Sequence, residues 1–462
     1  MAYDVVVIGA GVVGTAIARS LSQFDLRIAV LDAAHDVGQG TSKANTAILH
    51  TGFDATPGTL ESRLVRRGYH LLRDYARETG IPLEPTGAIL VAWDDEQHSK
   101  LAELKQKAES NEYRNCTTLS AEEVYRAIPS LGPGALGGLS VPDEAIICPW
   151  SPTIAFATEA VENGVDLLLG HAVTEVDCHV DGVTTLHTVA GPVRTRWVIN
   201  AAGLGADAID RSFGYDRFAV TPRRGQLLVF DKQARPLTEK IVLPVPSALG
   251  KGVLISPTVY GNIMLGPTAE DLDDKSATQT TQEGFDFLLE KGKRIIPALL
   301  DEEVTASYAG LRASINQGDY LVSRDDTQRY VLVGGIRSTG LTAAMAIGEY
   351  LVDFLDATDL ELTPKNEVSA PPTVNPIGER SKRPFQRPEL IAKDPAYGEI
   401  VCFCERATRG EIRDALRGAV AAVDRAGVSR RTRATNGRCQ GFYCGAEVEA
   451  MISQAKRDVH GF

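Results

Sequence analysis

Apolar runs and glycine turns alternate from the start of the chain. A continuous apolar run at 5–8 is followed by a glycine turn at 9–14, a stretch with helical apolar spacing at 15–23, and a second apolar run at 26–31. Short continuous apolar runs are typical of buried strands, whereas apolar residues three and four apart are typical of an amphipathic helix. The pattern therefore predicts a strand–helix–strand unit whose two strands lie parallel in one sheet.

The middle of the chain changes more than once between helical and strand-like patterns. We expect helices at 96–110, 121–128, 152–163, 283–294 and 341–355, and strands at 88–93, 197–202, 225–230, 252–255, 262–265 and 330–335. Such alternation predicts an α/β domain that is interrupted by a β-rich domain, with the chain crossing between the two more than once.

A proline-rich, charged stretch follows at residues 363–395. Its prolines stand at positions 364, 371, 372, 376, 384, 388 and 395. Such a composition buries little apolar surface, so we expect a linker here, followed by a compact C-terminal module.

Length and charge restrict the classes of protein. A chain of 462 residues is too long for one core and is expected to form two or three domains. The net charge of -12 argues against nucleic acid as a partner, because binding it would require a basic face. No apolar run approaches the roughly 20 residues that cross a bilayer. Seven cysteines occur with no secretion leader, so we expect reduced thiols or metal ligands and a cytoplasmic location.

The first glycine turn carries a nucleotide-binding pattern. Gly9, Gly11 and Gly14 form G-x-G-x-x-G between the predicted strand and helix, and Asp32 ends the second strand. These glycines allow a tight turn, backbone approach to a pyrophosphate and close helix–strand packing, while the acid can bind ribose hydroxyls. The pattern predicts a dinucleotide site but does not separate FAD from NAD.

A second formal match spans residues 203–208, after the strand that ends at Ala202. An NAD site here would need an acidic residue near position 226, where Gln226 stands. Arg223 and Arg224 leave open an NADP site, with its additional phosphate. The simpler interpretation, which we favour, is a strand-to-helix turn beside the first nucleotide.

Several motifs together resemble a known family. They are the glycine turn with Asp32 and the segments at 41–52, 57–60, 198–203, 222–226, 310–312 and 334–342. On these, residues 1–358 resemble the D-amino-acid-oxidase superfamily of flavoproteins, in the branch of glycerol-3-phosphate and L-2-hydroxyglutarate dehydrogenases. The resemblance implies FAD rather than NAD, and a substrate held against the flavin by a β-rich domain.

The resemblance also implies which residues contact the cofactor. Besides the three glycines and Asp32, the expected contacts come from a loop that wraps the flavin, from an adenine-side strand and from two helix-opening turns. They are Thr41, Ser42, Asn45, Thr46, Val173, Ala202, Gly203, Gly340, Leu341 and Thr342.

Three residues are candidates for the chemistry. On the resemblance, Arg312 and Arg337 reach the substrate face of the flavin, and two guanidinium groups there imply an anionic substrate. His50 follows the flavin loop and is our candidate for the base that takes the hydroxyl proton as hydride goes to the flavin. A buried structural histidine is the alternative. Lys251 is a weaker candidate for a substrate contact.

The C-terminal module holds four cysteines in two groups, C-x-C and C-x4-C. They are Cys402, Cys404, Cys439 and Cys444. Four thiolates are the usual ligands of a [2Fe-2S] cluster, and the spacing resembles the bacterioferritin-associated-ferredoxin-like (BFD-like) module. Structural zinc is the alternative, although zinc sites prefer two to four residues between paired ligands. Thr408 and Glu411 form a capping-box signature, so a helix should begin between them.

These features predict a three-part α/β protein. It comprises a Rossmann-like FAD-binding domain (1–85, 150–215 and 325–360), an inserted β-rich substrate domain (86–149 and 216–324), a linker (361–396) and a small α-helical BFD-like [2Fe-2S] domain (397–462).

The expected activity is that of an FAD-dependent dehydrogenase. Its substrate would be a small anionic secondary alcohol, glycerol 3-phosphate or a 2-hydroxy acid. A cluster accepts single electrons, so we expect transfer through it to a quinone or a protein acceptor. Peripheral membrane association and partner subunits are compatible with this interpretation. The alternatives are an amine or imino-acid dehydrogenase, and a non-catalytic flavin and iron–sulfur electron-transfer subunit.

Overall fold

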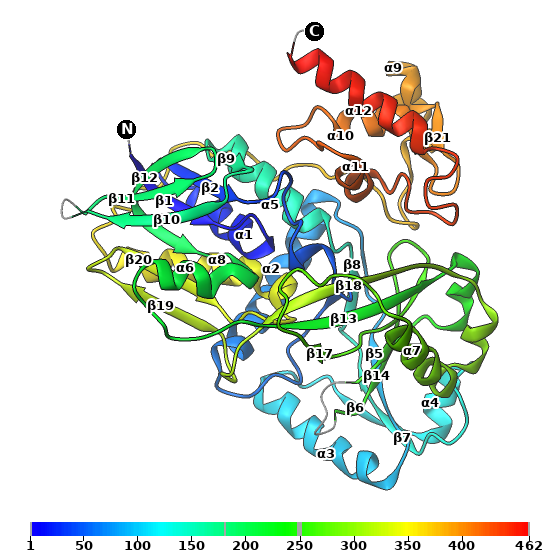
Figure 1. Ribbon diagram of the computed structural model, residues 1–462. Helices are drawn as coiled ribbons and strands as arrows, with labels where there is room; N and C mark the ends of the chain where they lie inside the picture. Colours follow the sequence, from blue (N-terminus) through cyan, green and yellow to red (C-terminus); the bar gives the residue numbers. More distant parts are fainter. Residues whose placement is uncertain (1, 180–181, 247–251, 461–462) are drawn as a thin grey trace.

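The computed structural model describes residues 2–179, 182–246 and 252–460, which form two large sheets and a C-terminal helical module (Figure 1). The first sheet has eight strands with its parallel part at the centre, where β1 lies between β12 and β2. Its strands are β1 (Tyr3–Ile8), β2 (Ile28–Asp32), β9 (Asp166–Leu169), β10 (Val173–Cys178), β11 (Thr184–Thr188), β12 (Gly191–Asn200), β19 (Leu321–Asp325) and β20 (Tyr330–Gly334).

Helices cover this sheet and bring three chain segments together. The apolar run of β1 is buried because helices lie on one side of it and β10, β11 and α6 on the other. The helices are α1 (Val12–Leu21), α2 (Leu60–Thr79), α5 (Ser151–Glu162), α6 (Ala206–Ser212) and α8 (Gly340–Asp356). Helices α1, α2 and α8 pack closely through glycines. A Cβ at Gly68 would lie 2.2 Å from the carbonyl of Thr342, and one at Gly348 would lie 2.8 Å from that of Ala16.

The second sheet has nine strands, mostly antiparallel, with α3, α4 and α7 around it. It contains β5 (Ala88–Ala92), β6 (Thr117–Ser120), β7 (Gly137–Val141), β13 (Thr221–Phe230), β14 (Ile241–Pro244), β15 (Leu254–Pro257), β16 (Ile263–Gly266), β17 (Glu270–Asp271) and β18 (Val304–Ser314). The helices are α3 (Asp95–Ser110), α4 (Ala121–Ala127) and α7 (Gln282–Ile295). A third, small sheet consists of β3 (Ile48–Leu49), β8 (Ala145–Ile147) and β4 (Leu83–Glu84).

The predicted elements are present, with two differences in detail from the sequence interpretation. Helix α1 begins at Val12, inside the glycine motif and not after it. The stretch predicted as a linker also buries side chains. It contains α9 (Pro388–Lys393), its Ile377 is 3% exposed, and Arg383 forms a buried ion pair with Glu411 at 2.7 Å. The segment is therefore packed against its neighbours.

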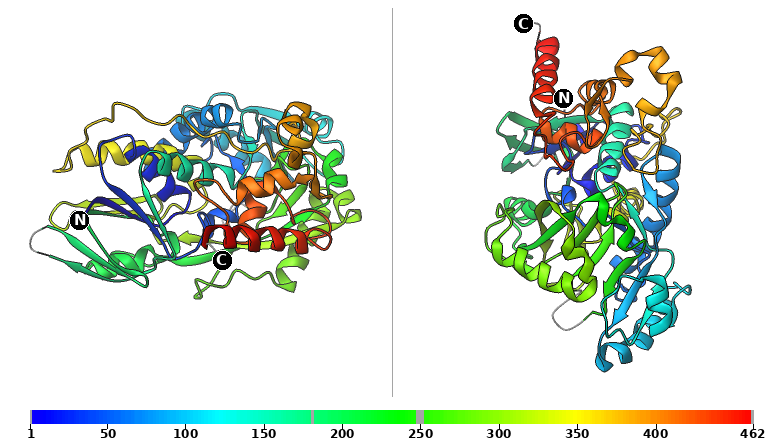
Figure 2. Two further views of the ribbon diagram at one scale, coloured as in Figure 1. Left: turned by 90° about the horizontal axis from the view of Figure 1, so that it is seen from above. Right: turned by 90° about the vertical axis from the view of Figure 1, so that its right-hand side faces the viewer.

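The C-terminal module lies at one end of the molecule (Figure 2). It consists of the hairpin β21 (Ile400–Cys402) and β22 (Ala407–Thr408) with α10 (Arg409–Ala415), α11 (Arg425–Thr432) and α12 (Gly445–His460). The predicted capping box is confirmed, since Thr408 caps α10 and Glu411 returns the hydrogen bond. Helix α11 faces the rest of the chain, while α12 lies on the outer side.

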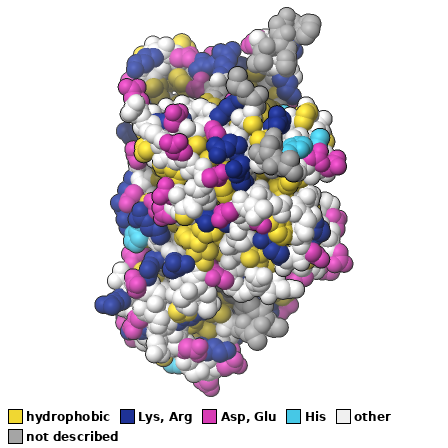
Figure 3. Space-filling view, turned by 90° about the vertical axis from the view of Figure 1, so that its left-hand side faces the viewer, with side chains coloured by type: hydrophobic (Ala, Val, Ile, Leu, Met, Phe, Trp, Pro, Cys, Tyr) yellow, Lys and Arg dark blue, Asp and Glu magenta, His cyan; other side chains and the backbone are white. Residues whose placement is uncertain are grey.

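The surface mixes charges of both signs. On the face shown in Figure 3, basic and acidic side chains are interspersed, with apolar side chains between them. In the described ranges, none of the helices combines the length and the apolar character needed to cross a bilayer.

Candidate active site and cluster site

The first glycine turn is shaped by close packing on one side and space on the other. Gly9 has a φ of +112°, and a Cβ there would lie 2.4 Å from the carbonyl oxygen of Ala201. A Cβ at Gly14 would lie 1.8 Å from the carbonyl oxygen of Gly9. A Cβ at Gly11 would meet only Ser42 Oγ, at 3.2 Å. Gly9 and Gly14 are thus required by packing, whereas Ser42 lies over Gly11 and its hydroxyl accepts from the first backbone N–H of α1 at 2.9 Å.

Asp32 holds the turn from the end of β2. Its carboxylate accepts hydrogen bonds from the backbone N–H of Ala10 at 2.6 Å and of Ala34 at 2.8 Å. Burial raises the pKa of Asp32, and these two donors act in the opposite direction. A carboxylate has about four acceptor positions, so it retains capacity for a further donor such as a ribose hydroxyl.

The predicted flavin loop is tied to strand β18. Thr41 Oγ1 donates to the carbonyl of Leu311 at 2.7 Å, and the Tyr308 hydroxyl donates to the carbonyl of Asn45 at 2.9 Å. Within the loop, the Asn45 amide donates to the Ser42 carbonyl at 2.8 Å. Thr46 lies in the same loop. The hydrogen bonds to β18 hold this loop against the strand that carries Arg312.

Other predicted cofactor contacts lie at two turns and one strand. Ala202 and Gly203 follow β12 beside Gly9, and a Cβ at Gly203 would meet no atom within 4 Å. Gly340, Leu341 and Thr342 form the first turn of α8, whose N-cap residue provides no side-chain cap. Val173 opens β10. Helix N-termini without side-chain caps and turns without side chains suit a dinucleotide, because their backbone N–H groups bind phosphate.

A histidine–carboxylate pair lies next to the flavin loop. Nδ1 of His50 is 3.0 Å from Oε2 of Glu144, whose side chain is fully buried. The other oxygen of Glu144 accepts from the backbone N–H of Thr51 at 2.7 Å and from its hydroxyl at 2.9 Å. The backbone N–H of His50 donates to Thr342 Oγ1 at 3.1 Å. Sequence reasoning missed Glu144, because no local pattern links it to His50.

The two predicted substrate arginines have different surroundings. Arg312 is half-buried and donates to the carbonyl of Thr268 at 3.1 Å; among the described residues it forms no ion pair. A Cβ at Gly225 would lie 2.5 Å from its guanidinium, so this glycine makes room for it. Burial and the neighbouring charge of Arg223 lower the pKa of Arg312.

Arg337 is engaged elsewhere. It adopts a left-handed φ of +53°, and its guanidinium forms an ion pair with Glu61 and donates to the Gly318 carbonyl at 3.1 Å. The two arginines therefore have different partners. Lys251 lies outside the described residues.

The second glycine match is the simple turn that we favoured. Arg223 is paired with Asp271 at 2.5 Å and Arg224 with Glu270 at 2.6 Å. Neither is free for the additional phosphate of NADP, so this alternative has no support.

The four C-terminal cysteines lie in two pairs. Cys402 neighbours Cys444, and Cys404 neighbours Cys439. Burial is the main cause that raises the pKa of Cys402 and of Cys404. The neighbouring thiol, Cys444 or Cys439 respectively, raises it further. In the described part of the chain no group of three or more His, Cys, Asp or Glu side chains has a geometry that would hold one metal ion. The charge of Cys402 also acts on Cys404, so the thiols of the two pairs lie close to each other, as the four thiolate ligands of one cluster must.

Backbone N–H groups are directed at these sulfurs. Those of Tyr443, Gly441 and Phe442 lower the pKa of Cys439, the first of them most strongly. Those of Thr435 and Glu405 act in the same direction on Cys402. Hydrogen bonds of this kind stabilise thiolates and are a general feature of iron–sulfur sites. The residues present therefore fit a [2Fe-2S] cluster.

Large aromatic side chains surround the cysteines on the outside. Phe403, Phe442 and Tyr443 are 74%, 83% and 75% exposed. Each lies next to or between cluster cysteines in the sequence, so the outer face of the cluster site is apolar and accessible.

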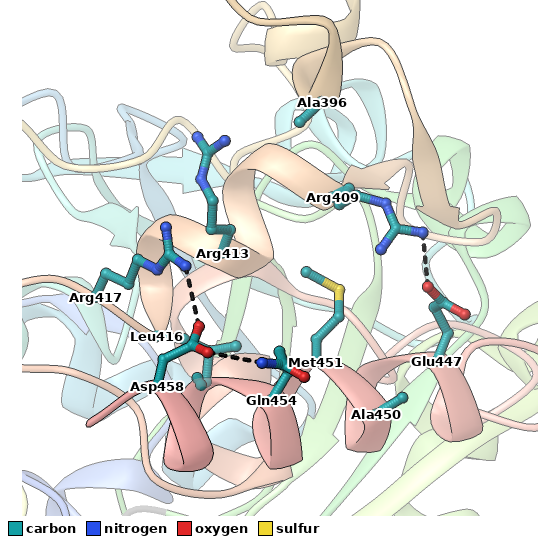
Figure 4. A pocket seen from close by; sticks show the side chains of 11 residues that line it. Ala396, Arg409, Arg413, Leu416, Arg417, Glu447, Ala450, Met451, Gln454 and Asp458 are labelled. Atoms are coloured by element: carbon teal, nitrogen blue, oxygen red, sulfur yellow. Dashed lines mark hydrogen bonds and ion pairs between the residues drawn. The ribbon is translucent and has the colours of Figure 1, made fainter. Parts of the chain in front are cut away.

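A groove of roughly 320 Å³ lies in the same module, between α10 and α12 (Figure 4). Its arginines are occupied. Arg409 pairs with Glu447 at 2.7 Å, and Arg417 pairs with Asp458 at 3.4 Å. The groove has no free cation for an anionic ligand among these residues, and it is lined entirely by module residues and Ala396.

Comparison with known proteins identifies the family of both parts of the chain. Residues 4–354 match the model of the FAD dependent oxidoreductase family, and residues 400–454 match the BFD-like [2Fe-2S] binding domain. A glycerol 3-phosphate dehydrogenase of Caloramator mitchellensis is 37% identical over 457 residues, which cover 98% of this chain and 94% of that protein. A glycerol 3-phosphate oxidase of Mycoplasma pneumoniae is 33% identical over 76% of this chain and 94% of its own length.

Among solved structures, the dithionite-reduced L-alpha-glycerophosphate oxidase from Mycoplasma pneumoniae with FAD bound has a TM-score of 0.75 at 31% identity. It covers 80% of this chain and 97% of its own.

Proposed function

Because this chain belongs to the FAD-dependent oxidoreductase family and ends in a BFD-like [2Fe-2S] binding domain, we propose that it oxidises glycerol 3-phosphate and passes the electrons through the cluster to a separate acceptor. The observation that carries the substrate assignment is Arg312, a half-buried guanidinium without a carboxylate partner in the described structure. A phosphate would supply the missing negative charge, since a guanidinium binds it through two parallel hydrogen bonds.

His50 is the proposed base. The Glu144 carboxylate accepts only, so the proton between them belongs on Nδ1, which leaves Nε2 with a free lone pair. Nε2 takes the proton of the substrate hydroxyl, and Glu144 stabilises the imidazolium that results. FAD, when bound, accepts the hydride from the carbon that bears this hydroxyl.

Thr51 completes this arrangement. Two hydrogen bonds from Thr51 hold one oxygen of Glu144, so the other oxygen is fixed toward His50. The backbone N–H of His50 is in turn held by Thr342 in the first turn of α8. The base is therefore positioned by the same helix that we propose to face the flavin.

Arg223 and Arg337 have supporting roles in this proposal. Arg223 lies opposite Arg312 on the neighbouring strand. Because Arg223 is paired with Asp271, it does not compete with Arg312 for the substrate phosphate. Arg337 fixes α2 against the turn before α8 through Glu61, which also accepts from Thr339 Oγ1 at 2.8 Å.

In this proposal the electron acceptor docks at the outer face of the cluster module. The exposed aromatic side chains around the cysteines favour docking of a quinone or a protein carrier at the outer face of the module. The cysteines form no disulfide among the described residues, and we propose a cytoplasmic location. Peripheral membrane contact or partner subunits would bring the cluster close to its acceptor.

The decisive experiment is anaerobic addition of substrates to the purified holoprotein, with the visible flavin absorbance as the readout. Glycerol 3-phosphate should bleach the flavin, whereas L-2-hydroxyglutarate, glycine and proline should bleach it far more slowly. Faster bleaching by hydroxyglutarate would change the substrate to a 2-hydroxy acid, and bleaching by the amino acids would favour amine oxidation. Absence of bleaching by every compound would contradict the proposal and favour the electron-transfer subunit.

A further inference from the structure

Arg433 occupies a backbone position that normally belongs to glycine. It follows the last residue of α11 and adopts a left-handed φ of +69°. Glycine is favoured at this position because a Cβ is strained there, by roughly 1 kcal/mol or more. The chain nevertheless places a long side chain at this point and buries it to 7% exposure. The contacts of this buried side chain must therefore offset the backbone strain.

The Arg433 guanidinium lies on an aromatic pair outside its own module. It is 4.1 Å from the ring centre of Tyr260 and 5.7 Å from that of Trp150, and the two rings stack at 5.5 Å with an angle of 18°. Tyr260 follows β15 of the second sheet, whereas Trp150 precedes α5, which packs on α1. One side chain of the cluster module therefore contacts both other parts of the molecule.

The contact continues at both ends. Nε1 of Trp150 donates to the carbonyl of Lys43, in the loop predicted to wrap the flavin, at 3.0 Å. At the other end, Nε of Arg433 lies 3.3 Å from Oε2 of Glu405, the residue after Cys404. Glu405 acts to raise the pKa of Arg433, against the effect of burial, so the guanidinium remains charged. A continuous series of packed groups thus connects the flavin loop with a cluster ligand.

A second buried contact fixes the same face of α11. Asp36 is fully buried and accepts two hydrogen bonds from Arg431, at 2.7 and 2.8 Å, and one from Arg430. Asp36 lies four residues after Asp32, close to the nucleotide turn. The orientation of α11 relative to the nucleotide-binding sheet is therefore determined by buried charges, which tolerate little displacement.

We propose that Arg433, seated on Trp150 and Tyr260, is the positioning residue that docks the cluster module on the flavin-binding part and provides the contact through which electrons pass from flavin to cluster. The inference rests on the proposed function only for the source of the electrons. With both cofactors bound, each transfer would remove one electron from the reduced flavin and add one to the oxidised cluster. A second transfer would follow once a one-electron acceptor outside the chain had reoxidised the cluster, and the proton of the reduced flavin would leave to solvent.

The test compares Arg433→Met with a matched control, Lys232→Gln. Both variants remove a cation that pairs with Glu405, but only the first removes the contact with the aromatic rings. In Arg433→Met we expect the flavin to be reduced by substrate within about twofold of the unchanged rate. Reduction of the cluster, followed by its electron paramagnetic resonance signal after rapid freezing, should slow at least tenfold. Lys232→Gln should change neither rate by more than about twofold.

A second readout does not depend on turnover. Trp150, one of three tryptophans in the chain, lies under Arg433, so Arg433→Met should shift tryptophan emission even in the apoprotein. Loss of docking should also increase protease cleavage within 361–396, the segment that precedes the cluster module. Arg433→Lys, which keeps the charge without the planar group, should recover only part of both effects.

Failure of this inference can be distinguished from failure of the proposed function. If glycerol 3-phosphate does not reduce the flavin, the flavin can be reduced photochemically and cluster reduction measured in the same way. If Arg433→Met loses iron or unfolds, Tyr260→Leu removes the ring from the opposite side of the contact and should give the same slow cluster reduction. Unchanged cluster reduction in a folded, iron-replete Tyr260→Leu or Arg433→Met variant would overturn the inference.

Discussion

Nδ1 of His50 lies 3.0 Å from Oε2 of Glu144, a carboxylate with no solvent exposure that comes from a turn 94 residues further along the chain. Thr51 holds the other oxygen of this carboxylate through its backbone and its hydroxyl. The pair therefore has a fixed direction, with Nε2 of the imidazole left for the substrate.

Replacing His50 by Gln should reduce the rate of flavin reduction by glycerol 3-phosphate by roughly 10²- to 10⁴-fold, because the base is lost. The FAD content should stay close to that of the unchanged protein. Stopped-flow absorbance measures the rate and the protein-to-flavin ratio measures the content. Near-normal turnover in His50→Gln would remove this residue from the mechanism.

Glu144→Gln tests the positioning role separately. The amide keeps the size of the side chain but can donate as well as accept, so Nδ1 is no longer defined as the protonated nitrogen. We expect a drop in kcat with little change in KM for glycerol 3-phosphate, and an altered pH profile. A change in KM alone would indicate that Glu144 serves only the shape of the site.

Arg312→Lys and Arg337→Lys should have different effects. Lysine loses the bidentate geometry, so Arg312→Lys should raise KM for glycerol 3-phosphate about tenfold to a hundredfold. Arg337 is occupied by Glu61, and its replacement should act mainly on thermal stability. Steady-state kinetics and thermal unfolding of both variants decide this. Equal KM increases would restore Arg337 as a substrate contact.

Substitution of one cysteine in each pair tests the cluster site. Cys402→Ser and Cys439→Ser should each abolish iron and sulfide binding while the protein retains its FAD, since the modules have separate cores. Iron, sulfide and flavin are measured in the same anaerobic preparation. Bound zinc in place of iron and sulfide would contradict the assignment.

Asp36 predicts how docking depends on pH. Although its burial acts to raise the pKa, the hydrogen bonds and charge of Arg431, followed by those of Arg430, hold the pKa of Asp36 below its ordinary value. A depressed carboxylate pKa stabilises the folded state above the unfolded value of about 3.9, and this contribution is lost as pH falls through the lower folded value. Docking should be constant from about pH 5 to neutrality and weaken below about pH 4.

Urea unfolding of the apoprotein measures this effect, with Asp36→Asn for comparison. Breaking a buried ion pair costs about 3–5 kcal/mol, so the variant should be destabilised near neutral pH and should show a flatter response to acid. An identical acid response in the two proteins would show that Asp36 is not responsible.

Most of the family assignment could be predicted from the sequence. The glycine turn, the cysteine spacing and the order of apolar runs are local patterns, and each has one dominant physical meaning. The predicted FAD and [2Fe-2S] cofactors and the flavoprotein family are confirmed by the matches over residues 4–354 and 400–454. The roles of the individual site residues stay predictions.

The sequence by itself determined that this chain has a dinucleotide turn and a site with four thiols, because a turn or a pair of thiols is specified by residues a few positions apart. Only the tertiary structure decided that Glu144 directs His50, that Glu61 occupies Arg337 from 276 residues away, and that Arg433 reaches Trp150 and Tyr260. These contacts depend on how whole elements pack, and no local spacing encodes which distant side chains a shared core brings together.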